Sequence, residues 1–115
     1  SAHGTSTQMN DRVETMAIKQ AFGAAAYEVP VISLKAQVGH SVIAAGALEA
    51  IACVLMLSQQ KLAPTINYNE FDPDCDLDYV PNQSRPAAVD RILSNNFGFG
   101  GQNASVIFER DLLEQ

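Results

Sequence analysis

The stretch of sequence that decides the fold runs from Ser41 to Gln59 and reads SVIAAGALEAIACVLMLSQ. It is nearly all apolar, with small residues at positions 44–47 and Glu49 as its only charged residue. A helix that is apolar all round is typically buried on all sides. We therefore expect a central core helix whose small residues let a neighbouring element approach closely. A membrane span is the competing interpretation, but the run falls short of the ~20 residues that a span needs and Glu49 interrupts it.

A second helix is predicted earlier in the chain, ending near Phe22. Asn10 or Asp11 can cap its beginning, and Gly23 supplies a stop at its end. Helical spacing places its apolar residues on one stripe and leaves its charged residues for solvent. The stripe consists of Val13, Met16, Ala17 and Ala21, and the residues expected in solvent are Arg12, Glu14 and Lys19.

Short strands are predicted on both sides of the central helix. Pro30 introduces the strand-like run at 31–34, and two further strands are expected at 91–95 and 104–108. Between positions 61 and 91 four prolines indicate a loop. The resulting order, α-β-α-loop-β-β, predicts a mixed α/β fold.

The composition is that of one small globular domain of 115 residues, 47% of them hydrophobic. The net charge of -6, without a basic cluster, argues against a nucleic-acid partner. No stretch resembles a signal peptide, so a cytoplasmic protein is expected. Cys53 and Cys75 are too few to suggest a disulfide framework, and Cys53 is expected to act as a small buried hydrophobe.

Two short motifs are compared with cofactor sites and rejected. The run 72–78 alternates aspartates as a calcium loop does, but such a loop needs glycine and glutamate where this chain has Leu77 and Gln83. The glycine-rich run 98–101 invites comparison with dinucleotide fingerprints, but the third glycine would fall at Asn103 and no helix follows. Neither a metal nor a nucleotide cofactor is therefore expected.

The chain has only two histidines, His3 and His40, and each stands next to a glycine. Imidazole is well suited to proton transfer and hydrogen-bond donation near neutral pH. Taken alone, their spacing favours two unrelated polar residues in loops, and Lys35 would be a surface lysine. If His40 begins the central helix, the positive end of the helix dipole disfavours its charged form.

The sequence around these residues resembles the C-terminal part of the β-ketoacyl-[acyl-carrier-protein] synthases. These are the elongating condensing enzymes of fatty-acid and polyketide synthesis, within the thiolase superfamily. Four motifs in family order carry the resemblance: AHGTST at 2–7, the segment from Lys35 through His40 to Gly46, PTIN at 64–67 and NFGFGG at 96–101. The resemblance implies the C-terminal half of a thiolase-like layered α/β fold, with a buried central helix and a mixed sheet.

The resemblance also implies roles for individual residues. The two histidines would stabilise the enolate that forms when a malonyl thioester loses carbon dioxide. Glu49 would be the partner of Lys35, and Phe99 would contribute a backbone amide to an oxyanion hole and a ring that gates the acyl pocket. The remaining implied contacts are phosphopantetheine at Thr5 and Thr7, and the acyl pocket at Phe97, Gly98 and Gly100. Gln102 replaces the Thr or His often found in this turn, which puts its side-chain contacts in doubt.

The nucleophilic cysteine of the family matches neither cysteine of this chain. The chain is thus expected to be a fragment, residues 1–115 of a C-terminal domain without the N-terminal half, and inactive alone. Expected partners are malonyl- and acyl-loaded acyl carrier protein and the N-terminal half, with a homodimer when complete and no membrane partner. The implied function is fatty-acid chain elongation. The alternatives are a polyketide ketosynthase and a non-catalytic scaffold.

Overall fold

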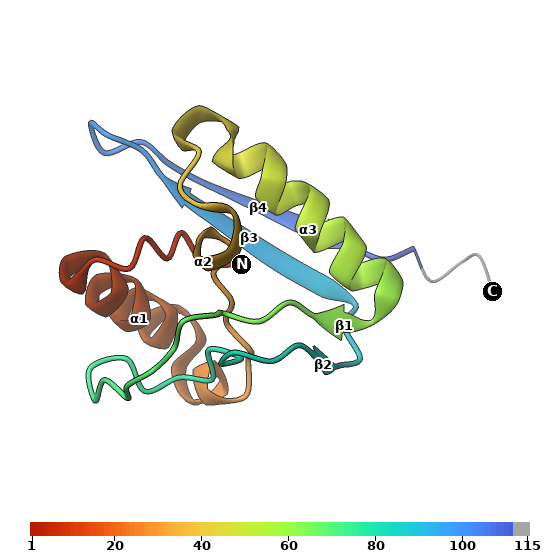
Figure 1. The fold of residues 1–115 in the computed structure, drawn as a ribbon, viewed down its shortest axis with the longest axis horizontal. Coiled ribbons are helices and arrows are strands. Elements are labelled where there is room, and N and C mark those ends of the chain that lie inside the picture. The colour runs from red at the N-terminus through yellow and green to blue at the C-terminus, as the bar shows by residue number, and fades with distance from the viewer. Residues whose placement is uncertain (112–115) are drawn as a thin grey trace.

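In the computed structural model, which describes residues 1–111, a long helix packs lengthwise along an antiparallel hairpin (Figure 1). The helix is α3 (Ala45–Gln59), and the hairpin consists of β3 (Arg91–Phe97) and β4 (Asn103–Glu109). Arg91 pairs with Glu109 at one end of the hairpin and Phe97 with Asn103 at the other. The mixed α/β fold and the two predicted strands are confirmed, and each strand extends beyond its predicted bounds.

Only one side of α3 is buried. Cys53, Met56 and Leu57 pack with Ile92 of β3 in the main hydrophobic cluster. The opposite side is exposed along the apolar stripe formed by Leu48, Ile51, Val54 and Leu55. The expectation of burial on all sides is therefore wrong for this chain. The described residues offer one sheet face to cover a helix that is apolar all round.

The segment from Val42 to Gln59 is also long and apolar enough to cross a membrane, and 28% of it is buried. Length alone therefore does not separate the two interpretations of the sequence. The packing of α3 against β3 favours the core helix, because its one charged residue, Glu49, lies on the buried side.

Helix α1 (Gln8–Phe22) differs from the prediction in its N-terminal cap and in the face that it buries. Thr7 caps it by accepting a hydrogen bond from the Asn10 amide, so neither Asn10 nor Asp11 is the cap. Its most buried residue pair is Glu14 and Thr15, whereas the predicted apolar stripe is exposed, with Met16 67% accessible. Glu14 is buried because its carboxylate binds backbone amides of the preceding loop. Gly23, at φ 58°, ends the helix as predicted.

The segment 31–34 is buried but is not a strand. The Val31 amide donates to the Asp78 carbonyl, and the Ile32 carbonyl accepts from the Ala2 amide. Its two neighbours are loops rather than a strand, so no regular ladder forms. After 3₁₀ helix η1 (Gly23–Tyr27), this segment leads into the single-turn helix α2 (Lys35–Val38) and 3₁₀ helix η2 (Val42–Ala44).

The long connection between α3 and β3 is mostly loop, as predicted. It contains one short antiparallel pair, β1 (Lys61–Leu62) with β2 (Arg85–Pro86), which the sequence did not suggest. The acidic run is held down by ion pairs to cations. Asp74 pairs with Arg12 and Asp76 with Lys19, both on α1, and Asp78 pairs with Arg85.

Candidate active site

His3 lies in the tight loop between Ser1 and α1 and is buried. Both oxygens of the Glu14 carboxylate hold this loop, accepting from the His3 amide at 2.8 Å and the Gly4 amide at 2.9 Å. Gly4 has φ 44°, and a Cβ there would lie 2.6 Å from Cβ of Ser33. Only glycine therefore fits beside His3, since any side chain would collide with Ser33. Sequence reasoning missed Glu14, which it placed in solvent.

His40 follows α2 and Gly39, and the fold brings it beside His3. The two ring centroids are 5.7 Å apart, and the ring planes are nearly perpendicular at 87°. His40 is exposed, and η2 separates it from α3, so it does not begin the long helix itself. The structure thus joins two residues that stand 37 positions apart, which spacing alone did not predict.

Both histidines use Nδ1 as a hydrogen-bond acceptor. The Phe97 amide donates to Nδ1 of His3 at 3.3 Å, and the Val42 amide donates to Nδ1 of His40 at 3.2 Å. An acceptor nitrogen carries no proton, so the proton of each neutral ring resides on Nε2. Burial, and then the positive charge of Lys35, lower the pKa of His3. Near neutral pH His3 is therefore an uncharged Nε2–H donor.

Lys35 and Glu49 form a buried ion pair, with 5% and 2% of their side chains exposed. Nζ of Lys35 donates to Oε1 of Glu49, and Nδ2 of Asn96 donates to Oε2 at 2.6 Å. Every carboxylate oxygen therefore has a partner, as a buried charge requires. Asn96 stands next to Phe97, whose amide holds His3, so the network extends from α3 to the histidine loop. Sequence reasoning did not single out Asn96, although it lies inside the quoted NFGFGG motif.

The two threonines differ in their surroundings. Thr5 lines a cleft of roughly 450 Å³ together with His40 and Lys35. Thr7 is the cap of α1, and its hydroxyl lies 3.3 Å from that of Thr5. Tyr68 and Tyr79 also line this cleft. Burial raises the pKa of Tyr79 to about 12, so the Tyr79 hydroxyl stays uncharged at neutral pH.

The glycine-rich turn contributes one ring near the histidines. Phe97 lies 5.2 Å from His3 between ring centroids. Phe99 is at the tip of the β3–β4 turn and is 97% exposed, so the structure does not bring its ring to either histidine. Gly98 closes the turn by donating its amide to the Gln102 carbonyl at 2.6 Å, and Gly100 adopts φ 87°.

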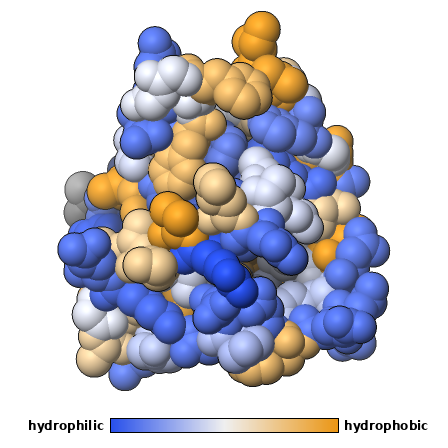
Figure 2. Space-filling model, turned by 90° about the vertical axis from the view of Figure 1, so that its left-hand side faces the viewer, coloured by the Kyte–Doolittle hydropathy of each residue, from blue (hydrophilic) through white to orange (hydrophobic). Residues whose placement is uncertain are grey.

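Figure 2 shows the face that carries this turn and the start of α1. Hydrophobic residues gather at its top, at the end of the molecule where η2 and the β3–β4 turn lie, and hydrophilic ones are interspersed below. This face of the molecule thus presents apolar surface beside polar surface.

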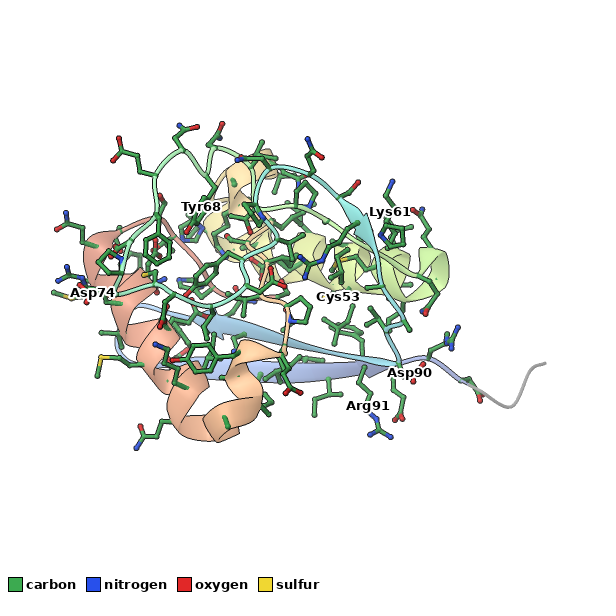
Figure 3. The ribbon with its side chains drawn as sticks, turned by 90° about the horizontal axis from the view of Figure 1, so that it is seen from below. Cys53, Lys61, Tyr68, Asp74, Asp90 and Arg91 are labelled. Carbon is green, nitrogen blue, oxygen red and sulfur yellow. The ribbon has the colours of Figure 1, made fainter. Side chains whose placement is uncertain are left out.

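Both cysteines of the chain are buried and free. Figure 3 shows Cys53 on α3 among the core side chains. Burial raises the pKa of both thiols, which keeps them protonated and poor nucleophiles. Neither is suited to carry an acyl group, in line with the buried role predicted for Cys53.

Comparison with known proteins gives one consistent result. Residues 1–69 match the beta-ketoacyl synthase C-terminal domain family. The chain is 52% identical to a putative polyketide beta-ketoacyl synthase 1 from Streptomyces cyaneus over 106 residues, 92% of this chain and 25% of that protein. It is 52% identical to 3-oxoacyl-[acyl-carrier-protein] synthase 2 from Synechocystis over 109 residues, 95% of this chain and 26% of that protein.

Solved structures agree with these sequence matches. One solved structure is a type II polyketide synthase acyl-carrier protein in complex with its ketosynthase. A chain of that complex superposes on this chain with a TM-score of 0.92, at 43% sequence identity. The ishigamide ketosynthase/chain length factor gives 0.90 at 44%. Each match covers 95% of this chain and 27% of the other. The chain therefore spans about a quarter of the length of the proteins that it matches.

Proposed function

Because this chain belongs to the β-ketoacyl synthase family, we propose that it is the C-terminal part of a 3-oxoacyl-[acyl-carrier-protein] synthase of fatty-acid elongation. The complete enzyme would act in the cytoplasm, accept acyl and malonyl groups from acyl carrier protein, and join them with loss of carbon dioxide. The observation that carries the proposal is the histidine pair: two rings 5.7 Å apart, each with Nδ1 occupied by a backbone amide.

The chemistry follows from the protons on Nε2. When a malonyl thioester loses carbon dioxide, negative charge develops on the thioester oxygen. Two Nε2–H donors aimed at that oxygen would stabilise the enolate, as preorganised oxyanion-hole donors do. The buried pair Lys35 and Glu49 supports this state, since the lysine charge disfavours protonation of His3.

The remaining groups have proposed supporting roles. Thr5 lines the cleft and would bind the phosphopantetheine arm, with Thr7 adjacent to it. Phe97, Gly98 and Gly100 would line the acyl pocket, and Phe99 would provide its amide and ring after movement of the exposed turn. The acyl-carrying thiol would come from the complementary N-terminal half, because both thiols here are buried and protonated at neutral pH.

The experiment is a chimera in which this chain replaces the matching region of the Synechocystis synthase. We expect the chimera to release carbon dioxide from malonyl-acyl carrier protein. His3→Ala and His40→Ala should each reduce the rate by about 10²–10³, as loss of an oxyanion-hole donor does. Lys61→Ala, an exposed change on β1, is the matched control. Full activity after both histidine changes would overturn the proposal.

A polyketide ketosynthase is the second candidate, because the Streptomyces cyaneus relative is as similar as the Synechocystis one. A parallel chimera in the Streptomyces glaucescens tetracenomycin ketosynthase alpha subunit, 50% identical to this chain, separates the two. The fatty-acid assignment predicts higher activity in the Synechocystis background. The reverse order would support the polyketide assignment, and inactivity in both backgrounds would support a non-catalytic scaffold.

A further inference from the structure

The motif PTIN at 64–67 lies outside the histidine pair, the buried ion pair and the glycine-rich turn. It follows β1 and runs past α2 (Figure 1). The Thr65 amide donates to the Val80 carbonyl at 2.9 Å, and the Asn82 amide donates to the Thr65 carbonyl at 2.9 Å. Val80 is 1% exposed and belongs to the main hydrophobic cluster. The backbone of Thr65 is therefore anchored to the core.

The side chain of Thr65 connects this anchor to the loop that carries His3. Its Oγ1 accepts a hydrogen bond from the Ser33 amide at 3.0 Å. The Ser33 hydroxyl in turn donates to the Gly4 carbonyl at 2.7 Å, and a Cβ at Gly4 would lie 2.6 Å from Cβ of Ser33. Since Gly4 directly follows His3, two consecutive hydrogen bonds and one close packing contact join Thr65 to the His3 loop.

The same motif also holds the segment that leads to His40. Nε2 of Gln37, on α2, donates to the Pro64 carbonyl at 2.6 Å. Gln37 lies two positions after Lys35, and Ser33 lies two positions before it. The motif therefore contacts this segment on both sides of Lys35, just before the chain turns into His40. Two adjacent residues of the motif thus reach the loops of both histidines.

We propose that Thr65 is a positioning residue, which acts through Ser33 and Gly4 to set the separation and angle of the two histidine rings. The rings come from different loops, so their 5.7 Å separation depends on the contacts between these loops. Donors to an oxyanion must converge on one oxygen. The consequence for the reaction rests on the proposed function, whereas the positioning itself needs no substrate.

The test measures the ring arrangement directly, by the nuclear Overhauser contact between the ring protons of His3 and His40 in the chain without substrate. Thr65→Val keeps a similar shape but removes the oxygen that the Ser33 amide requires. Thr65→Ser retains that oxygen. We expect the ring contact in the original chain and in Thr65→Ser, and its loss in Thr65→Val. Ser33→Ala, which breaks the next bond toward Gly4, is the second variant and should also lose the contact.

A change at Asn82 is the matched control. Its side chain makes two hydrogen bonds to the Tyr68 backbone, accepting from the amide at 3.0 Å and donating to the carbonyl at 2.6 Å. Asn82→Gly removes both bonds near the same motif, suits the φ of 59° at this position and leaves Ser33 untouched. It should keep the ring contact. A contact that persists in Thr65→Val and Ser33→Ala, or that is lost equally in Asn82→Gly, would overturn the proposal.

Kinetics of the Synechocystis chimera separate positioning from direct binding, because Thr65 also lines the cleft beside His40. Thr65→Val should lower kcat by up to about 10²-fold, the cost of a misplacement of about 1 Å, and leave KM for malonyl-acyl carrier protein unchanged. Thr65→Ser should restore most of the rate. A raised KM with unchanged kcat would assign Thr65 to ligand binding and overturn the proposal. If the unsubstituted chimera is inactive, the proposed function fails, and the ring contact alone decides this inference.

Discussion

At the scale of single residues, Glu14 holds the loop that positions His3. Its two oxygens accept the His3 and Gly4 amides. A glutamine has one acceptor oxygen, and its NH₂ group would face the second amide. We expect Glu14→Gln to lower the free energy of unfolding by about 1–3 kcal/mol, the cost of an unsatisfied buried donor. Urea denaturation measures this, with the exposed change Glu70→Gln as control; equal stabilities of the two variants would contradict it.

The lowered pKa of His3 makes stability depend on pH. Below about 6.5 the unfolded chain binds a proton that the folded chain resists, so unfolding becomes easier as the pH falls. Above that value the contribution of His3 is fully present. We expect a slope of at most about 1.4 kcal/mol per pH unit, reached between the ordinary pKa of the unfolded histidine and the lower pKa of folded His3.

His3→Asn isolates this contribution, because asparagine can keep an acceptor near the Nδ1 position while removing the titration. Urea denaturation between pH 5 and about 8 should show a shallower dependence for the variant. Burial also lowers the pKa of the Ser1 amino group. Because this group is present in both the original chain and the variant, its contribution cancels when their pH profiles are compared. An unchanged pH profile in the variant would contradict the assignment.

The sequence predicts the site residues that lie within the short motifs, but not the residues outside those motifs that hold them in position. The resemblance implied the Lys35–Glu49 pair, and the structure places the two in contact. Glu14 looked like a solvent residue because helical periodicity counts polarity and ignores the backbone amides of a neighbouring loop. The resemblance implies a phosphopantetheine contact for Thr7, and the structure adds that its hydroxyl caps α1.

At the scale of elements, Gln60 joins the end of α3 to the approach to β3. It adopts φ 50°, a left-handed conformation that favours glycine, yet its side chain makes three bonds. Nε2 donates to the Leu57 and Val89 carbonyls, and Oε1 accepts from the Val89 amide. Gln60→Glu removes both donors. We expect a loss of about 1–3 kcal/mol in unfolding free energy, compared with little change for the exposed Gln59→Glu. Equal midpoints in thermal unfolding would contradict this.

Long elements with strong patterns were predicted well, and short ones poorly. The apolar run of α3 and the strand-like runs on either side of the glycine-rich turn indicate their structure locally. The segment 31–34 has strand-like residues but pairs with two loops, a tertiary circumstance that no local pattern carries. The predicted start of α1 is wrong because Thr7, three residues before Asn10, caps the helix instead of Asn10 or Asp11.

At the scale of the whole molecule, the exposed side of α3 should control association. Leu48, Ile51, Val54 and Leu55 form the apolar stripe that β3 and β4 leave uncovered. Stripes of this kind mark interaction surfaces or aggregation hazards. We expect the chain alone to self-associate or to bind a hydrophobic dye, and Ile51→Glu to reduce both. Ser58→Glu, an exposed polar position on the same helix, is the control. Sedimentation of a stable monomer that binds no dye would contradict this.

The aspartates of the 72–78 loop give the molecule a sensitivity to ionic strength. Two of them hold the loop to α1 through Arg12 and Lys19, and all the partners are at least partly exposed. Dissolved ions screen such contacts, with a Debye length of about 3 Å at molar salt. Concentrated sulfate should therefore loosen the loop from α1 and open it to proteases, while the same kosmotropic salt strengthens apolar burial in the core around Cys53. Salt would thus act in opposite directions on the two halves of one small fold.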